Sequence, residues 1–272
     1  MPSGLYQIVG WGEFLNAILL PAGLILVRVL PIIFITPFLG GKLVPPETRI
    51  GLSIGMTMLV FPFATSTMVT ELNLTGPVFI VLLFKEMFIG FVIGFIATEL
   101  FYAMEIGGRA LDVMRGSNQA EVQVPELQLR ASPVGQFAFQ LLLVIFCTMN
   151  GHVYFIESVI ESFRMVPVDQ FPEFTRGFDE FVDQILRYSA GLFAIAFALV
   201  FPGLFASFLV DIVFGMFNRI APQLNAYFMA LGVKASAGLV MLFFSLTLMM
   251  DQMEVLLQDS LVFVRKLVGA LG

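Results

Sequence analysis

Several charged side chains lie inside long apolar stretches of this chain. In that setting they can line an ion pathway or form polar contacts between helices. Five such residues are Arg28, Lys85, Glu86, Glu99 and Asp211. An ionisable group within a membrane span is costly to bury, so it marks a substrate or ion pathway or pairs with another group. The residue pattern leaves both roles open: transport on one side, helix packing and assembly on the other.

Enzymatic chemistry finds no support in the sequence. It contains no HExxH, no GxSxG and no glycine-rich phosphate loop. His152 is the single histidine and Cys147 the single cysteine, which excludes a histidine metal cluster and an intrachain disulfide. Because Asn150 and Gly151 precede His152, we interpret this position as a turn or helix break rather than a proton relay. We expect no catalytic residue, no cofactor and no metal site.

Composition places the chain in a membrane. Hydrophobic residues make up 58% of it and charged residues 12%, which is about half the charge of a soluble domain. The apolar runs are long enough to cross a bilayer. The net charge of -6, with 14 basic residues and no basic run, excludes nucleic acid as a partner. The sequence predicts an integral, multi-pass membrane protein surrounded by lipid.

An all-α fold is predicted, with five or six long, proline-kinked hydrophobic helices that form helical hairpins. The hydrophobic segments cover residues 14–39, 50–69, 76–104, 134–166, 188–220 and 223–248. We interpret residues 167–187 as a solvated acidic loop with a short amphipathic helix, and Ala221 and Pro222 as a sharp break. The whole chain, 1–272, is predicted to be a single domain.

The third segment has two unlike faces at 100° per residue. The aromatic face is formed by Phe84, Phe88, Phe91 and Phe95, and the small, acidic face by Glu86, Gly90, Gly94 and Ala97. Small residues spaced four apart let a second helix backbone come close. We expect the small face to pack against protein. Lys85 and Glu86 are adjacent on the helix, so we do not expect them to face each other.

A polar insert at about 106–132 separates two strongly hydrophobic segments. Its charges are balanced and are carried by Arg109, Asp112, Arg115, Glu121, Glu126 and Arg130. Long connections in compact proteins are usually functional or disordered. Its glycines, at 107, 108 and 116, predict a flexible stretch.

Four strings resemble the FliR/SctT family of type III secretion export-gate subunits. They are RVLPIIFITPFLGGKLVPPETRIGLS, FKEMFIGFVIGFIATELFYAMEIGGRALDVMRG, MNGHVYFIES and FNRIAPQLNAYFMALGVKA. Together they cover nearly the whole chain in the family's order, and NRIAPQLN followed by Lys234 is the most specific part. The NGH at 150–152 is more similar to the flagellar FliR branch than to the injectisome branch.

The resemblance implies a non-enzymatic subunit of the protein export gate. Such a subunit forms part of a protein-conducting pore in the bacterial inner membrane, at the flagellar basal body or the injectisome base. It is needed for export of unfolded flagellar proteins and for flagellum assembly. The implied partners are the P-type and Q-type subunits (FliP, FliQ), the FlhB/SctU switch protein and unfolded exported proteins in transit. Packing against P and Q subunits would shield Lys85 and Glu86.

The insert corresponds to the plug that closes the pore in this family. The expected plug or pore residues are Gly107, Gly108, Arg109, Asp112, Met114, Arg115, Gly116, Asn118 and Gln119. The residues expected in intramembrane packing or assembly are Arg28, Lys85, Glu86, Gly90, Gly94, Glu99, Asp211, Asn218, Arg219, Pro222, Gln223 and Lys234.

A secondary transporter of a small solute is the alternative, with the intramembrane charges as coupling groups. The chain lacks the internal hydropathy symmetry of many transporter folds. Counting basic residues places the insert on the cytoplasmic side but Arg265 and Lys266 outside, so the membrane orientation stays open.

Overall fold

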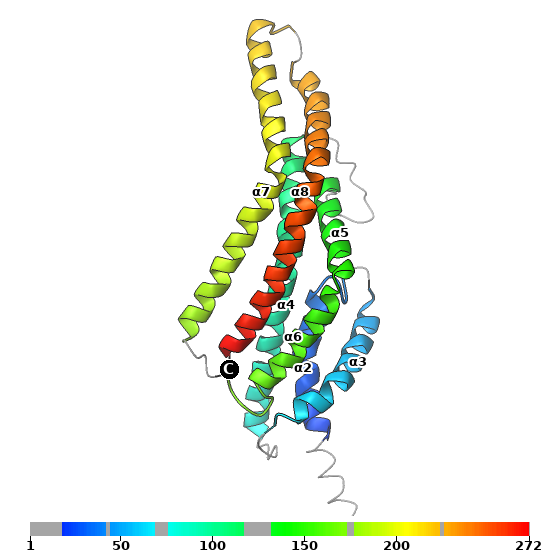
Figure 1. Cartoon of the computed structure of the whole chain (residues 1–272), viewed down its shortest axis with the longest axis vertical. Helices are drawn as coiled ribbons and strands as arrows, with labels where there is room; N and C mark the ends of the chain where they lie inside the picture. Colours follow the sequence, from blue (N-terminus) through cyan, green and yellow to red (C-terminus); the bar gives the residue numbers. More distant parts are fainter. Residues whose placement is uncertain are drawn as a thin grey trace, which may run out of the picture. The chain divides into compact units, whose positions relative to one another are not determined.

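The computed structural model describes residues 18–41, 44–68, 76–116, 132–172, 177–223 and 226–271. Figure 1 shows the helices in chain order. They are α2 (Leu20–Ile35), α3 (Pro46–Thr65), α4 (Gly76–Met114), α5 (Pro133–Thr148), α6 (Gly151–Met165), α7 (Phe178–Ile220) and α8 (Ala226–Leu271). The described residues form helices and contain no strand. The predicted all-α fold class is confirmed.

Four of these helices are long and apolar enough to cross a membrane. They are α3, α7, most of α4 (Pro77–Met114) and most of α8 (Phe228–Leu267). The pair α5 and α6 would make a fifth if the two count as one broken span, and α2 is a shorter apolar helix of 16 residues. Apolar helices of this length satisfy their own backbone groups in lipid, so the chain is a membrane protein.

Two predicted helix breaks are confirmed. The backbone of Asn150 is left-handed, with φ 57°, and it separates α5 from α6. Asn is one of the few residues with a side chain that adopt this conformation readily. α7 ends at Ile220, directly before the predicted break, where Pro222 has no N–H to continue the helix.

Two predicted boundaries are wrong. The third segment does not end at residue 104, because α4 continues without a break to Met114. The first third of the predicted insert is therefore helix. The fifth segment does not begin at residue 188, because α7 begins at Phe178 and includes the last part of the predicted acidic loop and its short helix. In both places the helix continues into polar residues beyond the hydrophobic segment.

The chain forms two compact units, each described by itself below. Unit 1 comprises Met1–Thr98, Asn150–Ile185 and Asp259–Gly272, and unit 2 comprises Glu99–Met149 and Leu186–Gln258. Three of the four boundaries fall inside α4, α7 and α8, and the fourth falls at the break between α5 and α6. The number of independent domains therefore stays a prediction.

In unit 1, α2 packs against α3 and α4. Its buried side includes Leu24, Ile25 and Ile32, each at most 1% exposed. A Cβ at Gly90 would meet the backbone carbonyl of Arg28, and one at Gly94 would lie 3.2 Å from the Cα of Ile32. The two glycines thus let the α2 and α4 backbones come together, as their spacing predicts.

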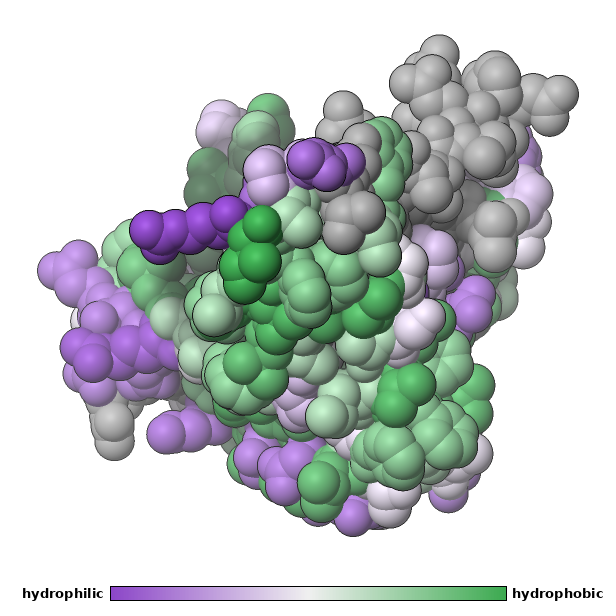
Figure 2. All heavy atoms as spheres, turned by 90° about the horizontal axis from the view of Figure 1, so that it is seen from above, coloured by the Kyte–Doolittle hydropathy of each residue, from purple (hydrophilic) through white to green (hydrophobic). Residues whose placement is uncertain are grey.

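The aromatic face of α4 points outward, as predicted. Phe84 is 64% exposed and Phe91 53%, whereas Glu86 on the small face is fully buried. Apolar side chains cover much of the face seen in Figure 2. Exposed apolar surface of this extent is suited to lipid or to neighbouring subunits.

Candidate functional site

Unit 1 holds a buried cluster of charges between α2, α4 and the end of α6. Arg28 and Glu86 are both 0% exposed and Lys85 is 7% exposed. The guanidinium of Arg28 donates two hydrogen bonds to the Glu86 carboxylate. Nη2 donates to Oε1 at 2.9 Å, and Nε donates to Oε2. Bidentate pairs of this kind are the strongest geometry available to arginine. One carboxylate thereby ties two helices together.

Arg28 also closes the C-terminal end of α6. It donates from Nη1 to the carbonyl oxygen of Ser162 at 2.8 Å and from Nη2 to that of Val166 at 2.9 Å. The last carbonyls of a helix have no partner within it and carry partial negative charge. The guanidinium also lies 4.0 Å from the centre of the Phe163 ring. Every face of this buried cation is therefore occupied.

Lys85 is paired with Glu86, which corrects the expectation that the two do not face each other. Its Nζ lies 2.6 Å from Glu86 Oε1. Although adjacent side chains leave a helix in different directions, the long flexible stem of lysine can bend back. The ammonium also donates to the backbone carbonyls of Pro167, Val168 and Gln170, at 2.9 to 3.0 Å.

These contacts also correct the expectation that P and Q subunits shield Glu86 and Lys85. The shielding groups come from the chain's own α2 and from the turn that follows α6. Arg28 lies 58 positions from Glu86 in the sequence, so no local pattern connects them. The prediction that this face of α4 packs against protein holds, but the protein is the chain itself.

Unit 2 joins the end of α4 to the start of α5 through Asp112. Its Oδ2 accepts a hydrogen bond from the Ser132 hydroxyl at 2.7 Å and one from the Val134 backbone N–H at 2.9 Å. Ser132 caps α5 and accepts from Gly135 N–H, and Pro133 follows it. Free N–H groups at a helix start attract a carboxylate. We call Asp112, Ser132 and Val134 the insert clamp.

Arg115 extends the insert clamp to α8. Its Nη1 lies 3.2 Å from Asp112 Oδ1, and its Nε donates to the carbonyl of Ala235 at 3.2 Å. A Cβ at Gly238 would lie 2.6 Å from the Arg115 side chain, so α8 has a glycine where the arginine crosses it. Gly116 then ends the helix with φ 77°, the left-handed conformation typical of glycine after a helix.

Gly107 and Gly108 do not supply the flexibility that was predicted. Both lie inside α4 and are buried. A Cβ at Gly107 would lie 2.9 Å from the carbonyl oxygen of Ala196 on α7, and one at Gly108 2.6 Å from the Cα of Gly135 on α5. They are glycines because three backbones meet there. Among the predicted plug residues, only Gly116 has the conformation of a loop glycine.

The remaining predicted plug residues divide between helix and undescribed chain. Arg109 is on the exposed side of α4 and pairs with Glu105 at 3.0 Å. Met114 is the last helical residue and is partly buried. Asn118 and Gln119 lie outside the described residues. The structure thus brings Asp112 and Arg115 together with α5 and α8 and leaves Arg109 apart.

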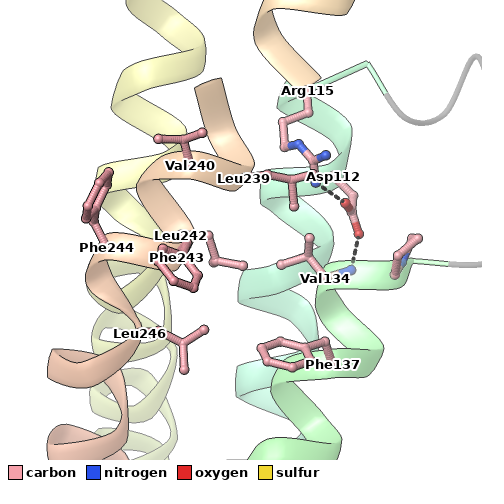
Figure 3. A pocket seen from close by; sticks show the side chains of 11 residues that line it. Asp112, Arg115, Val134, Phe137, Leu239, Val240, Leu242, Phe243, Phe244 and Leu246 are labelled. Carbon is pink, nitrogen blue, oxygen red and sulfur yellow. Dashed lines mark hydrogen bonds and ion pairs between the residues drawn. The ribbon is translucent and has the colours of Figure 1, made fainter. Parts of the chain in front are cut away.

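An apolar pocket of about 690 Å³ lies beside the insert clamp, between α5 and α8. Figure 3 shows Val134 and Phe137 on one wall and Leu239, Leu242 and Leu246 on the other. Its polar lining consists of Asp112 and Arg115, whose charges are already paired. The pocket therefore offers a polar solute no free charge.

The other predicted assembly residues lie in unit 2. Asp211 on α7 and Lys234 on α8 form an ion pair. Asn218 and Arg219 are exposed in the last turn of α7, and Pro222 and Gln223 are exposed in the turn after it. Glu99 is buried on α4 and makes no ion pair among the described residues.

Several contact residues were missed by the sequence reasoning. Ser132, Gly135, Ser162 and Gly238 contact the predicted charges or glycines. Ser132 followed by Pro133 is a helix-start signature that could have been found. The others acquire their roles only from tertiary packing.

These features define the class of protein: an all-helical membrane protein with paired charges buried between its helices, whose described residues hold no group of three or more metal-binding side chains. The chain belongs to family 1 of the bacterial export proteins, whose family model matches residues 19–260. The resemblance found in the sequence is thereby confirmed.

Relatives of two kinds match over most of their lengths. The flagellar biosynthetic protein FliR of Bacillus subtilis (strain 168) is 30% identical over 226 residues, 82% of this chain and 85% of the relative. The Yop proteins translocation protein T of Yersinia pestis is 28% identical over 233 residues, 85% of this chain and 86% of the relative. The surface presentation of antigens protein SpaR of Shigella flexneri is 24% identical, covering 87% and 89%.

Proposed function

We propose that the chain is a non-enzymatic subunit of a flagellar or type III protein export gate in the bacterial inner membrane. It forms part of the protein-conducting pore and serves export of unfolded flagellar proteins. Similarity to FliR of Bacillus subtilis supports the flagellar role. Its proposed partners are the P-type and Q-type subunits and the FlhB/SctU switch protein. Exposed apolar surface on α4, α7 and α8 offers them contact area.

We further propose that the insert helps to close the pore, with its working part between Gly116 and Ser132. The observation that carries this proposal is the insert clamp. The chain leaves α4 at Gly116 and enters α5 at Ser132. Asp112, in the last turn of α4, accepts hydrogen bonds from the Ser132 hydroxyl at 2.7 Å and from the Val134 N–H at 2.9 Å. Residues 117–131 lie outside the described chain. Because both ends of the insert are fixed to helices, the insert can return to the same closing position after each opening of the pore.

The alternative, a small-solute transporter, requires charges that are free to bind a solute or a coupling ion. Arg28, Lys85 and Glu86 are all engaged in buried contacts. Asp211 is paired with Lys234. The geometry therefore favours the export gate over the transporter.

The test replaces residues 117–131 with a short Gly/Ser linker and keeps α4 and the insert clamp intact. The variant should assemble with P and Q subunits at normal yield, and vesicles containing the complex should leak small ions. Asp112→Asn should leak as well, because a neutral amide holds the α5 start less firmly. Arg109→Gln is the matched control, since Arg109 is on the same helix but exposed. If the linker variant is as tight as the intact complex, the insert does not close the pore.

A further inference from the structure

The apolar pocket between α5 and α8 has a buried floor and an exposed rim, all within unit 2. Val134 on α5 is 4% exposed and Leu242 on α8 is 7% exposed. Phe243 and Phe244 line the same pocket but are 72% and 73% exposed. The space of about 690 Å³ is therefore deepest beside Val134 and Leu242 and opens where the two phenylalanines lie.

The lining changes from polar to apolar along the pocket. Asp112 and Arg115 are its charged residues, and they lie at the end of the Pro77–Met114 span of α4. Figure 3 shows them at one end of the pocket, with Phe137 and Leu246 toward the other. This is the polarity of an amphiphile whose polar part lies beside the end of α4 and whose hydrocarbon part follows α5 and α8.

The rim is part of an apolar surface. Phe243 and Phe244 fall within Phe228–Leu267, the part of α8 that is long and apolar enough to cross a membrane. Beside them on α8, Met241 is 45% exposed and Leu248 is 68% exposed. A molecule enters the pocket by passing this hydrocarbon surface, which favours one that is already dissolved in the bilayer over a solute from water.

A hydrocarbon chain is the occupant that such a wall stabilises. Water needs two to four polar partners in a cavity, and the polar groups here are already bonded to each other and to the start of α5. An apolar void left without contents loses the dispersion contacts of its lining. Lipid chains are as apolar as leucine, so contact with the walls rather than release of water holds a chain in place.

We propose that this pocket binds one acyl chain of a bilayer phospholipid, with the ester end of the chain beside Asp112 and Arg115. From Leu239 to Leu246 the α8 wall extends about 10 Å, so an extended chain contacts several turns of helix. Because the two charges at the polar end neutralise each other, the pocket selects the hydrocarbon and not the charge of the headgroup. The site requires only unit 2 and stands independently of the proposed export role.

Native mass spectrometry of the full-length subunit, stripped of lipid in a maltoside detergent, tests this site. Wild type incubated with dioleoyl phosphatidylglycerol or with dioleoyl phosphatidylcholine should retain one phospholipid per subunit in both cases. Leu239→Trp and Val240→Trp place a large ring in the pocket and should each lower the bound fraction about tenfold, because the ring displaces the chain from the walls. Leu248→Trp is the matched control on the same helix, outside the lining, and should bind as the wild type does.

Leu239 and Val240 are about half exposed, at 48% and 52%, so the tryptophan variants should keep the helix content of the wild type in circular dichroism. A wild type that retains no phospholipid overturns the proposal, as do tryptophan variants that bind as well as Leu248→Trp. Retention of phosphatidylglycerol without phosphatidylcholine also overturns it, because the headgroup charge would then decide binding. If the wild type binds neither lipid and the tryptophan variants lose the P subunit, the pocket receives a protein side chain instead. The lipid measurements use the isolated subunit, so their failure leaves the proposed export role untouched.

Discussion

Replacement of Glu86 with glutamine tests whether the buried charge cluster stabilises the subunit itself. The side chain keeps its shape and one acceptor oxygen but loses its charge. Arg28 and Lys85 would then remain as two buried cations, 0% and 7% exposed, without the carboxylate that both contact. Their carbonyl acceptors at Ser162, Val166 and the turn after α6 are unchanged. The substitution therefore isolates charge compensation from hydrogen bonding.

The expected loss is about 3–5 kcal/mol of unfolding free energy, the range seen when one partner of a buried ion pair is removed. Removing Arg28 as well, in Glu86→Gln/Arg28→Met, should cost less than the sum of the single changes, because one uncompensated cation disappears. Glu157→Gln is the matched control. Its pair with Arg265 has the same ionic chemistry at 2.8 Å but is about half exposed, so we expect a loss of at most about 1 kcal/mol.

Unfolding by sodium dodecyl sulfate, followed by circular dichroism, measures five purified proteins under one condition: the wild type, Glu86→Gln, Arg28→Met, the double variant and Glu157→Gln. Yield of the complex with tagged P subunit should fall in parallel with stability. If Glu86→Gln is as stable as Glu157→Gln, the cluster does not hold the helices together. If it is stable but fails to bind the P subunit, Glu86 acts in assembly, as the residue pattern alone also allows.

Three further predictions use the same unfolding assay. Gly90→Ala should lower the unfolding free energy by about 1–3 kcal/mol, because its Cβ would meet the Arg28 carbonyl. Gly51→Ala is the control and should change little, since a Cβ there has open space; equal effects would argue against the close α2–α4 contact. Asn150→Ala should lower the unfolding free energy by about 1–2 kcal/mol because the backbone there is left-handed, whereas Asn150→Gly should be tolerated. An alanine tolerated equally well would contradict the sharp break between α5 and α6. Ser132→Ala should lower the unfolding free energy by about 1 kcal/mol through loss of the α5 cap, and an unchanged midpoint would show that the Asp112 contact is not formed.

The sequence predicted those features that depend on local pattern. The opposed faces of α4 followed from 100° periodicity, and the breaks at Asn150 and Pro222 followed from backbone preferences. The family resemblance supplied the export role, which no periodicity could show.

The sequence did not predict the contacts between residues that are distant in the chain. Arg28 and Glu86 were each recognised as charged groups in apolar segments, but nothing local pairs residues 58 positions apart. Gly107 and Gly108 were interpreted as flexible because glycine favours loops, whereas here it removes side-chain bulk where backbones meet. A glycine pair predicts a loop and a close helix contact equally well until the neighbouring helices are placed.

The buried charge cluster also has a consequence for biosynthesis. α2 carries Arg28 and is synthesised before α4, since Glu86 lies 58 residues later, and the carbonyl acceptors at Ser162 and Val166 follow 134 and 138 residues after Arg28. The arginine is therefore made before the carboxylate that it contacts in the folded protein. All of its contacts can form only after α6 and the turn that follows it have been synthesised.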